Sequence, residues 1–137
     1  MSLDPINPPD LGPTTGFSQG QLGKEGGRVL FVAGQIGVDG EWPVGEPPLV
    51  AQFGEALRRI LRVVEDAGGE PKDVARMTVY VTDIDLYRSS RKALGGTWRS
   101  RMGSHYPAMA LVEVKSLLDP LALVEIEATA VIGGRVA

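Results

Sequence analysis

Few residues of this chain are able to do chemistry. It contains one histidine, His105, and no cysteine, which excludes disulfides, thiol catalysis and thiolate metal sites. A single histidine also argues against a zinc site, so we predict no bound metal. His105 follows a serine in a predicted loop and has no evident acidic partner. We therefore interpret His105 as a solvated turn residue rather than a catalytic base.

The stretch that follows the histidine has the appearance of a binding site. Residues 104–114 read SHYPAMALVEV, in which a proline precedes a predicted strand that opens on Met109. A site for a charged ligand would present a charge at that position. The methionine raises the question of what this chain binds, and the answer depends on the elements that position it.

Length and composition limit the class of protein. The chain has 137 residues, of which 43% are hydrophobic and 23% charged, as in an ordinary globular domain. A net charge of -3 without a Lys/Arg stripe argues against nucleic acid as a partner. No apolar run approaches the roughly 20 residues that span a bilayer. We expect no membrane association and a cytoplasmic location.

The periodicity of apolar residues predicts the order of elements. We expect an extended N-terminal segment (1–15), one domain (16–133) and a C-terminal tail (134–137). The predicted elements of the domain are strands 17–22 and 28–33, helix 49–67, strand 74–81, helix 86–102, and strands 108–114 and 121–132. The first two strands read as a hairpin around turn 23–27, and residues 34–48 as a loop. This order predicts an α+β fold with one sheet and two helices on one face.

Side-chain alternation assigns the strands to faces of that sheet. Residues 29–32 are all apolar, so we expect a central strand covered on both faces. On the last two strands, the small and branched side chains are assigned to the helix side: Ala110, Val112, Val114, Val124, Ile126, Ala128 and Ala130. The opposite face would carry Met109, Leu111, Glu113, Leu123, Glu125, Glu127, Thr129 and Val131. That face is too apolar for water, so we expect a second copy of the chain to cover it.

Six segments together resemble the RidA/YjgF family of reactive-intermediate deaminases, which are also described as endoribonuclease L-PSP-like. They are GFSQG (16–20), LFVAGQI (30–36), EDAGG (65–69), VYVTD (79–83), PAMALVEV (107–114) and VEIEA (124–128). The resemblance covers about residues 13 to 133 in the family's order. It implies chorismate-mutase-like subunits that assemble as a homotrimer with a barrel-like core. It also implies a small-molecule ligand in each of the three clefts between subunits.

The resemblance further implies a chemistry. The best-known members hydrolyse enamines and imines such as 2-aminoacrylate to 2-keto acids and ammonia, without metal or cofactor. In those members an arginine that opens the penultimate strand holds the substrate carboxylate, and a glutamate in the last strand handles the water. In this chain Glu125 falls on that glutamate and Gly34 on the family's cleft glycine.

Four positions of the predicted site depart from the family's pattern. Phe17 replaces a tyrosine, Ala33 a serine, Arg91 an asparagine of the second helix, and Met109 the arginine itself. The predicted site thus comprises Glu125 as the catalytic residue, with Phe17, Ala33, Gly34, Arg91 and Met109 binding ligand. The chain resembles a subgroup without the carboxylate-binding arginine.

Each of these residues also has a structural interpretation. Met109 would fill a gap at an interface, and Glu125 would accept hydrogen bonds there. Arg91 would pack its stem along the helix surface, or would reach the cleft and replace the missing arginine. We interpret the other helix residues as structural: Tyr87 and Trp98 as packing residues, and Arg99 and Arg101 as a solvated helix end. The alternative for Trp98 is a place near the cleft.

The favoured function is a RidA-like homotrimer whose deaminase activity is lost or altered. If the chain is an enzyme, it is a hydrolase of the imine or enamine deaminase type. The alternative is a non-enzymatic module that binds a metabolite or a protein through the same surface. Ribonuclease activity is a third interpretation, and the acidic charge of the chain argues against it.

Overall fold

A four-stranded mixed sheet forms the centre of the fold, with the strands in the order β3-β6-β4-β5. The strands are β3 (Arg28–Ile36), β4 (Val74–Val81), β5 (Ala108–Glu113) and β6 (Val124–Ile132). β5 runs parallel to β4, and β6 pairs antiparallel with both of its neighbours. The computed structural model describes residues 2–39 and 48–133. The predicted tail 134–137 and most of the predicted loop 34–48 lie outside the described residues.

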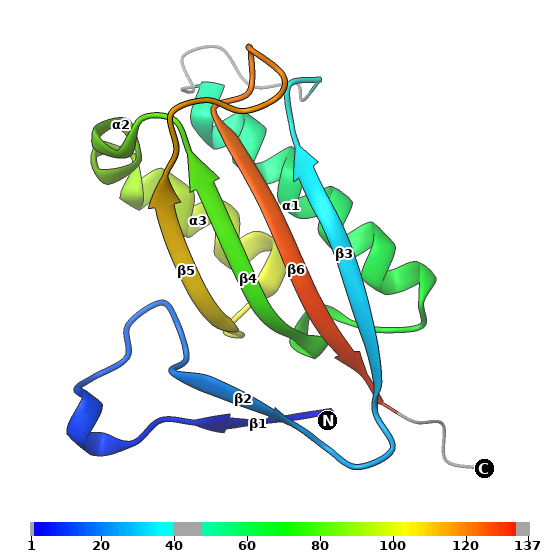
Figure 1. The fold of residues 1–137 in the computed structure, drawn as a ribbon. Coiled ribbons are helices and arrows are strands. Elements are labelled where there is room, and N and C mark those ends of the chain that lie inside the picture. The colour runs from blue at the N-terminus through cyan, green and yellow to red at the C-terminus, as the bar shows by residue number, and fades with distance from the viewer. Residues whose placement is uncertain (1, 40–47, 134–137) are drawn as a thin grey trace.

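All three helices cover one face of this sheet (Figure 1). They are α1 (Pro48–Asp66), α2 (Ile84–Ser89) and α3 (Arg91–Met102). The prediction for α1 is confirmed, but the predicted helix 86–102 is interrupted at Ser90. Asp83 caps α2 by accepting a hydrogen bond of 3.0 Å from the Leu86 amide. None of the helices in the described ranges is long and apolar enough to cross a membrane.

The faces of β6 agree with the prediction from alternation. Val124, Ile126 and Ala130 are fully buried beneath the helices, and Glu127 is exposed on the opposite face. The helix-side residues of β6 form one hydrophobic core with α1 and β4. We refer to the uncovered side of the sheet as the open face.

The predicted faces of β5 are wrong. Met109 and Leu111 pack against the core, in register with the fully buried Met77 and Val79 of β4. Val112 is consequently on the open face and 42% exposed. Both alternating sets of β5 are apolar, so alternation alone could not distinguish its two sides.

Two more residues assigned to the open face lie on the helix side. Leu123 packs against the core, and its amide donates a 2.8 Å hydrogen bond to the side chain of Gln52 on α1. Glu113 accepts a 3.0 Å hydrogen bond from the amide of Ile84, where α2 begins. Glu113 ends β5 and follows the same alternation as Met109 and Leu111, in register with the buried Val81. Leu123 directly precedes β6, outside its regular alternation.

The predicted hairpin between residues 17–22 and 28–33 is also wrong. β2 (Gly20–Gly23) pairs with β1 (Leu3–Ile6), which lies within the predicted extended segment. This separate two-stranded ribbon crosses one end of the main sheet (Figure 1). β3 is an edge strand rather than a central one, and its Phe31 is 79% exposed on the open face.

Two glycines provide a matched test of the packing of α1 and of the stability of α3. Gly37 packs so closely on α1 that a Cβ there would overlap the backbone carbonyl of Gln52, whereas a Cβ at Gly96 on α3 would meet nothing. We expect Gly37→Ala to lower the free energy of unfolding by about 1 to 3 kcal/mol through overpacking. Gly96→Ala should raise it by up to about 1 kcal/mol, because alanine favours the helix.

Urea unfolding of both variants and the parent chain measures these changes. A Gly37→Ala protein as stable as the parent would contradict the close contact between the segment after β3 and α1.

Candidate functional site

A cavity of about 290 Å³ lies between α3, the start of β5 and the segment around Thr15. We call it the α3 cavity. Its apolar wall is built from α1, α3 and β5, through Phe53, Leu94, Trp98 and Met109. Two arginines of α3, Arg91 and Arg99, also line it. The cavity therefore combines an apolar interior with positive charge, as suits an organic anion.

Aromatic stacking fixes one side of this cavity. The rings of Trp98 and Tyr106 are stacked, with centroids 5.8 Å apart and an interplanar angle of 3°. The indole of Trp98 also donates a 3.2 Å hydrogen bond to the carbonyl of His105. The ring of Phe53 lies 6.5 Å from that of Trp98. α3 is thus anchored to α1 and to the segment before β5, which makes this wall rigid.

Arg91 and Tyr87 form the polar end of the α3 cavity. Burial raises the pKa of the Tyr87 hydroxyl, and the neighbouring positive charge of Arg91 opposes that rise. Arg91 forms no ion pair with a carboxylate of the described residues. Its charge remains available to a ligand.

Met109 shares this cavity with Arg91 because β5 turns the methionine to the helix side. These two are the predicted ligand-binding residues that the fold brings together. An arginine in place of Met109 would extend into the same cavity. Sequence reasoning had assigned Met109 to the opposite face, and only its pairing with Met77 corrects that assignment.

The other predicted residues of β3 and β6 lie apart from the α3 cavity. Glu125 is on the open face, half-buried, and its side chain lies against Gly34. A Cβ on Gly34 would be 2.9 Å from the carboxyl carbon of Glu125. The close approach occurs at a break in register between Val32 and Gln35, where Ala33 is exposed. We call Ala33, Gly34 and Glu125 the Glu125 cluster.

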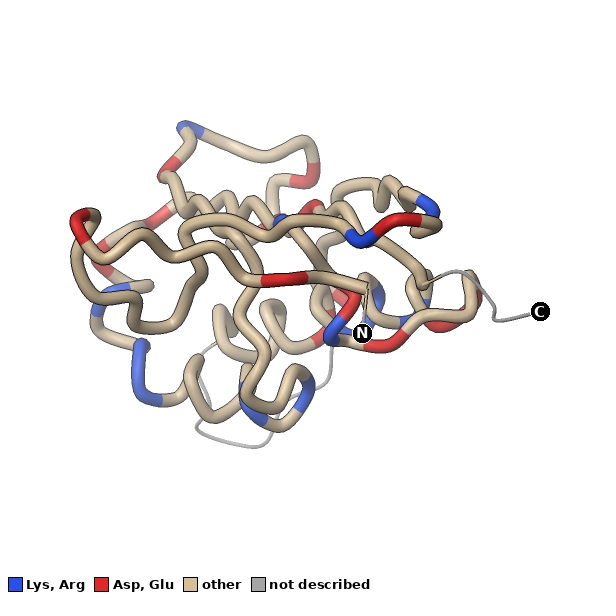
Figure 2. The backbone as a smooth tube through the Cα atoms, turned by 90° about the horizontal axis from the view of Figure 1, so that it is seen from below, with Lys and Arg blue, Asp and Glu red and all other residues tan. Residues whose placement is uncertain are grey.

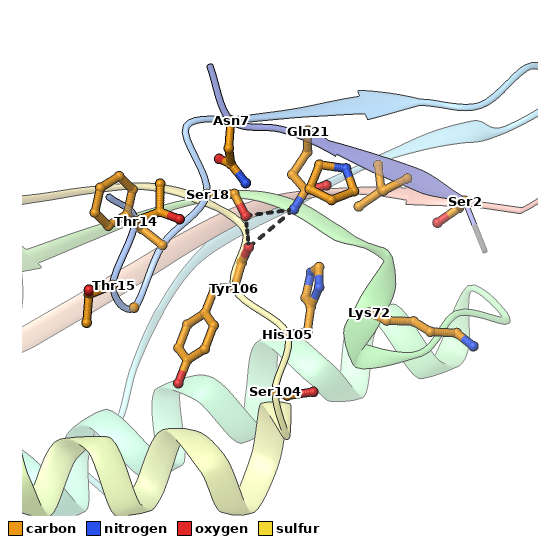
Figure 3. A pocket seen from close by; sticks show the side chains of 14 residues that line it. Ser2, Asn7, Thr14, Thr15, Ser18, Gln21, Lys72, Ser104, His105 and Tyr106 are labelled. Atoms are coloured by element: carbon orange, nitrogen blue, oxygen red, sulfur yellow. Dashed lines mark hydrogen bonds between the residues drawn. The ribbon is translucent and has the colours of Figure 1, made fainter. Parts of the chain in front are cut away.

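Phe17 lines a different cavity, of about 550 Å³, beneath the N-terminal ribbon (Figure 3). The hydroxyl of Ser18 donates a 2.7 Å hydrogen bond to the backbone carbonyl of Tyr106. The side-chain nitrogen Nε2 of Gln21 donates to the Ser18 hydroxyl oxygen and to the same carbonyl. The side-chain oxygen of Gln21 is buried without a hydrogen-bond partner among the described residues. This network holds the ribbon against the segment that precedes β5.

The interpretation of His105 as a solvated turn residue is wrong. Its ring is half-buried and lines the same cavity beneath the N-terminal ribbon (Figure 3). Nε2 lies 2.7 Å from the carbonyl of Val74, and since a carbonyl only accepts, Nε2 carries the proton. The histidine therefore connects the segment before β5 to the start of β4.

Sequence reasoning also missed several residues of the α3 cavity. Tyr87, predicted only to pack, and Arg99, predicted to be solvated, contribute to its lining. Trp98 lines it too, in agreement with the alternative that placed Trp98 near the cleft. The spacing of Arg91, Gly95 and Arg99 at intervals of four could have indicated one helix face. Nothing in the sequence indicates which face is turned toward a cavity.

Charged residues of both signs are spread over the described part of the chain. Lys and Arg positions are interspersed with Asp and Glu (Figure 2). Within residues 2–39 and 48–133, no three His, Asp or Glu side chains are grouped as ligands of a metal ion would be. The described residues thus offer the arginine-lined α3 cavity and, apart from it, the Glu125 cluster.

These features define a small α+β domain with an arginine-lined cavity at the edge of its sheet. The family model described as Endoribonuclease L-PSP matches residues 9–132. A RutC family protein from Pyrococcus abyssi is 31% identical over 105 residues, which are 76% of this chain and 79% of that protein. The chain belongs to the RidA/YjgF family.

Two further relatives are informative. A protein named 2-iminobutanoate/2-iminopropanoate deaminase, from Salmonella typhimurium, is 30% identical over 108 residues, which are 77% of this chain and 80% of that protein. A crystal structure of YyfB, a Rid family protein of unknown function from Yersinia pestis, superposes with a TM-score of 0.79 at 31% identity. The superposition covers 96% of this chain and 100% of the YyfB chain. The family and the α+β fold predicted from the sequence are confirmed.

The position of Arg91 beside Tyr87 can be tested without a ligand. Because the charge of Arg91 favours the ionised phenol, Arg91→Met should raise the pKa of Tyr87 further. Titration of carbon-13-labelled tyrosines by NMR measures this, with Tyr87→Phe to assign the resonance. Arg88→Met, which removes a cation paired with Asp85 at 3.1 Å, should leave that pKa unchanged. Equal effects of the two arginine variants would contradict the arrangement.

Proposed function

We propose that the protein is a homotrimer that binds a small organic carboxylate in clefts between its subunits. The proposal is supported by the separation of the predicted site within one chain. Met109 faces the helix side of the sheet, and Glu125 faces the open side. A site that uses both must therefore combine the α3 cavity of one subunit with the Glu125 cluster of another.

The open face supports an assembly because it exposes apolar side chains. Val29 is 58% exposed and Phe31 is 79% exposed on the edge strand β3, with Val112 across the sheet on β5. Exposed apolar surface of this kind favours burial against another chain. The proposed interface therefore contains these residues and not Leu111 and Leu123, which sequence reasoning had assigned to it.

Arg91 is the proposed contact for the ligand carboxylate. The observation that carries this role is that Arg91 and Met109 line the same cavity. Arg91 on α3 could bind a carboxylate in the same cavity that an arginine at position 109 on β5 would enter. The deaminase relative at 30% identity suggests small imino or keto acids as the class of ligand.

Catalysis is proposed to be weak or altered relative to the deaminases. Met109 and Ala33 lack the polar groups that the family resemblance places around a carboxylated imine, and Phe17 lacks a hydroxyl. Glu125 remains as the candidate catalytic residue. Ribonuclease activity has less support, because the chain is acidic and its basic residues are interspersed with acidic ones (Figure 2).

The assembly can be tested by light scattering at micromolar concentration, where we expect the mass of a trimer. Phe31→Glu places a charge on the proposed interface and should yield monomers. Val63→Glu is a matched control, since Val63 is exposed on α1, away from the open face. A monomeric parent chain would contradict the proposal.

The carboxylate contact can be tested by calorimetric titration with pyruvate and benzoate. We expect weak binding to the parent chain. Arg91→Met should weaken it by at least ~1.5 kcal/mol, the lower end for a hydrogen bond to a charged group. Arg88→Met should have no effect. If the parent chain fails to bind and Met109→Arg alone creates binding, Arg91 is not the contact.

The reaction can be tested with 2-aminoacrylate generated in the assay. We expect hydrolysis close to the uncatalysed background, because three polar groups around the substrate are missing. Met109→Arg should raise the rate if the carboxylate contact is what limits it. A robust rate in the parent chain that disappears in Glu125→Ala would show that the deaminase is intact and that Glu125 is catalytic.

A further inference from the structure

α3 presents a second arginine to the same cavity. Arg91, Gly95 and Arg99 are spaced four residues apart and all line the α3 cavity. Residues separated by four lie on one face of a helix, one turn above another. The two arginines are thus on one helix face, with the glycine between them.

The side chain of Arg99 lies back along the helix over Gly95. A Cβ added to Gly95 would be 3.2 Å from Nη1 of Arg99, so the guanidinium occupies the space that the missing side chain leaves. Arg99 is in the last turn of α3, where a cation often stabilises the exposed carbonyls. Its guanidinium instead lies one turn toward the N-terminus, on the side of Arg91. This is the direction in which long side chains on a helix usually project.

The charged residues of α3 are all basic. α3 carries Arg91, Lys92, Arg99 and Arg101 and no acidic residue, in a chain whose net charge is -3. Neither Arg91 nor Arg99 forms an ion pair with a carboxylate of the described residues. An anionic ligand between the two arginines would pair with both charges.

We infer that the ligand of the α3 cavity is a short dicarboxylate, with one carboxylate held by Arg91 and the other by Arg99. The inference rests on the proposed function and adds a second anionic group to its ligand. The Cα atoms of the two arginines are separated by about 12 Å along the helix axis at ~1.5 Å per residue. The Arg99 guanidinium lies over Gly95, which is about 6 Å along the axis from the Cα atom of Arg91 at ~1.5 Å per residue. The side chains of Met109 and Leu94 would contact the carbon chain between the carboxylates.

The experiment is a calorimetric titration of the full chain at low salt with succinate, glutarate and adipate. Butyrate, which has one carboxylate, is the reference ligand. We expect the best of the three dicarboxylates to bind at least ~10-fold more tightly than butyrate, since each charged hydrogen bond contributes about that factor. Arg99→Met should remove this preference, so that no dicarboxylate binds more tightly than butyrate does to the same variant. Arg99→Lys should restore part of the preference by returning the charge.

Arg101→Met is the matched control, because Arg101 is on the same helix but does not line the α3 cavity. It should leave the preference intact. Equal affinity for butyrate and all three dicarboxylates, with Arg91 still required, would overturn the second contact while the proposed carboxylate site stands. A dicarboxylate preference that survives Arg99→Met would also overturn the inference. If the parent chain binds none of the four acids, both the inference and the proposed carboxylate site are wrong.

Discussion

The parallel pairing of β5 with β4 is the contact on which the candidate site depends. It places Met109 opposite the fully buried Met77 and so turns the methionine toward α3. A shift of one residue would exchange the two faces of β5 and move Met109 to the open face. The segment before β5 is held by the stack of Trp98 on Tyr106 and by the hydrogen bond from His105 to Val74. These contacts fix the register and, with it, the composition of the α3 cavity.

The division of the predicted site between two faces has a consequence for function. One chain supplies an arginine-lined cavity on the helix side and a glutamate on the open face, and the sheet between them keeps the two apart. Family membership and an apolar open face both suit an assembly in which neighbouring subunits unite these parts. A reaction that uses Glu125 together with the cavity would then require the oligomer, whereas the arginines that would bind the ligand come from one chain.

Much of the fold followed from local patterns in the sequence. The helical spacing of Phe53, Leu57 and Val64 predicted α1, and strict alternation predicted which side of β6 is buried. Six short segments were enough to place the chain in its family. They also drew attention to Arg91 and Met109, which the structure places in one cavity. The roles of Arg91, Met109 and Glu125 remain proposals.

The sequence by itself determined the family, the sheet with its helices on one face and the buried side of β6, because each of these follows from local periodicity or from motif order. Only the tertiary structure decided the orientation of β5, since both of its alternating sets are apolar and pairing with β4 selects between them. The same holds for the partner of β2, which depends on contacts between distant segments. The position of Arg99 over Gly95 also depends on the tertiary structure. The sequence shows which residues share one face of a helix, but not whether that face is turned to solvent or to a cavity.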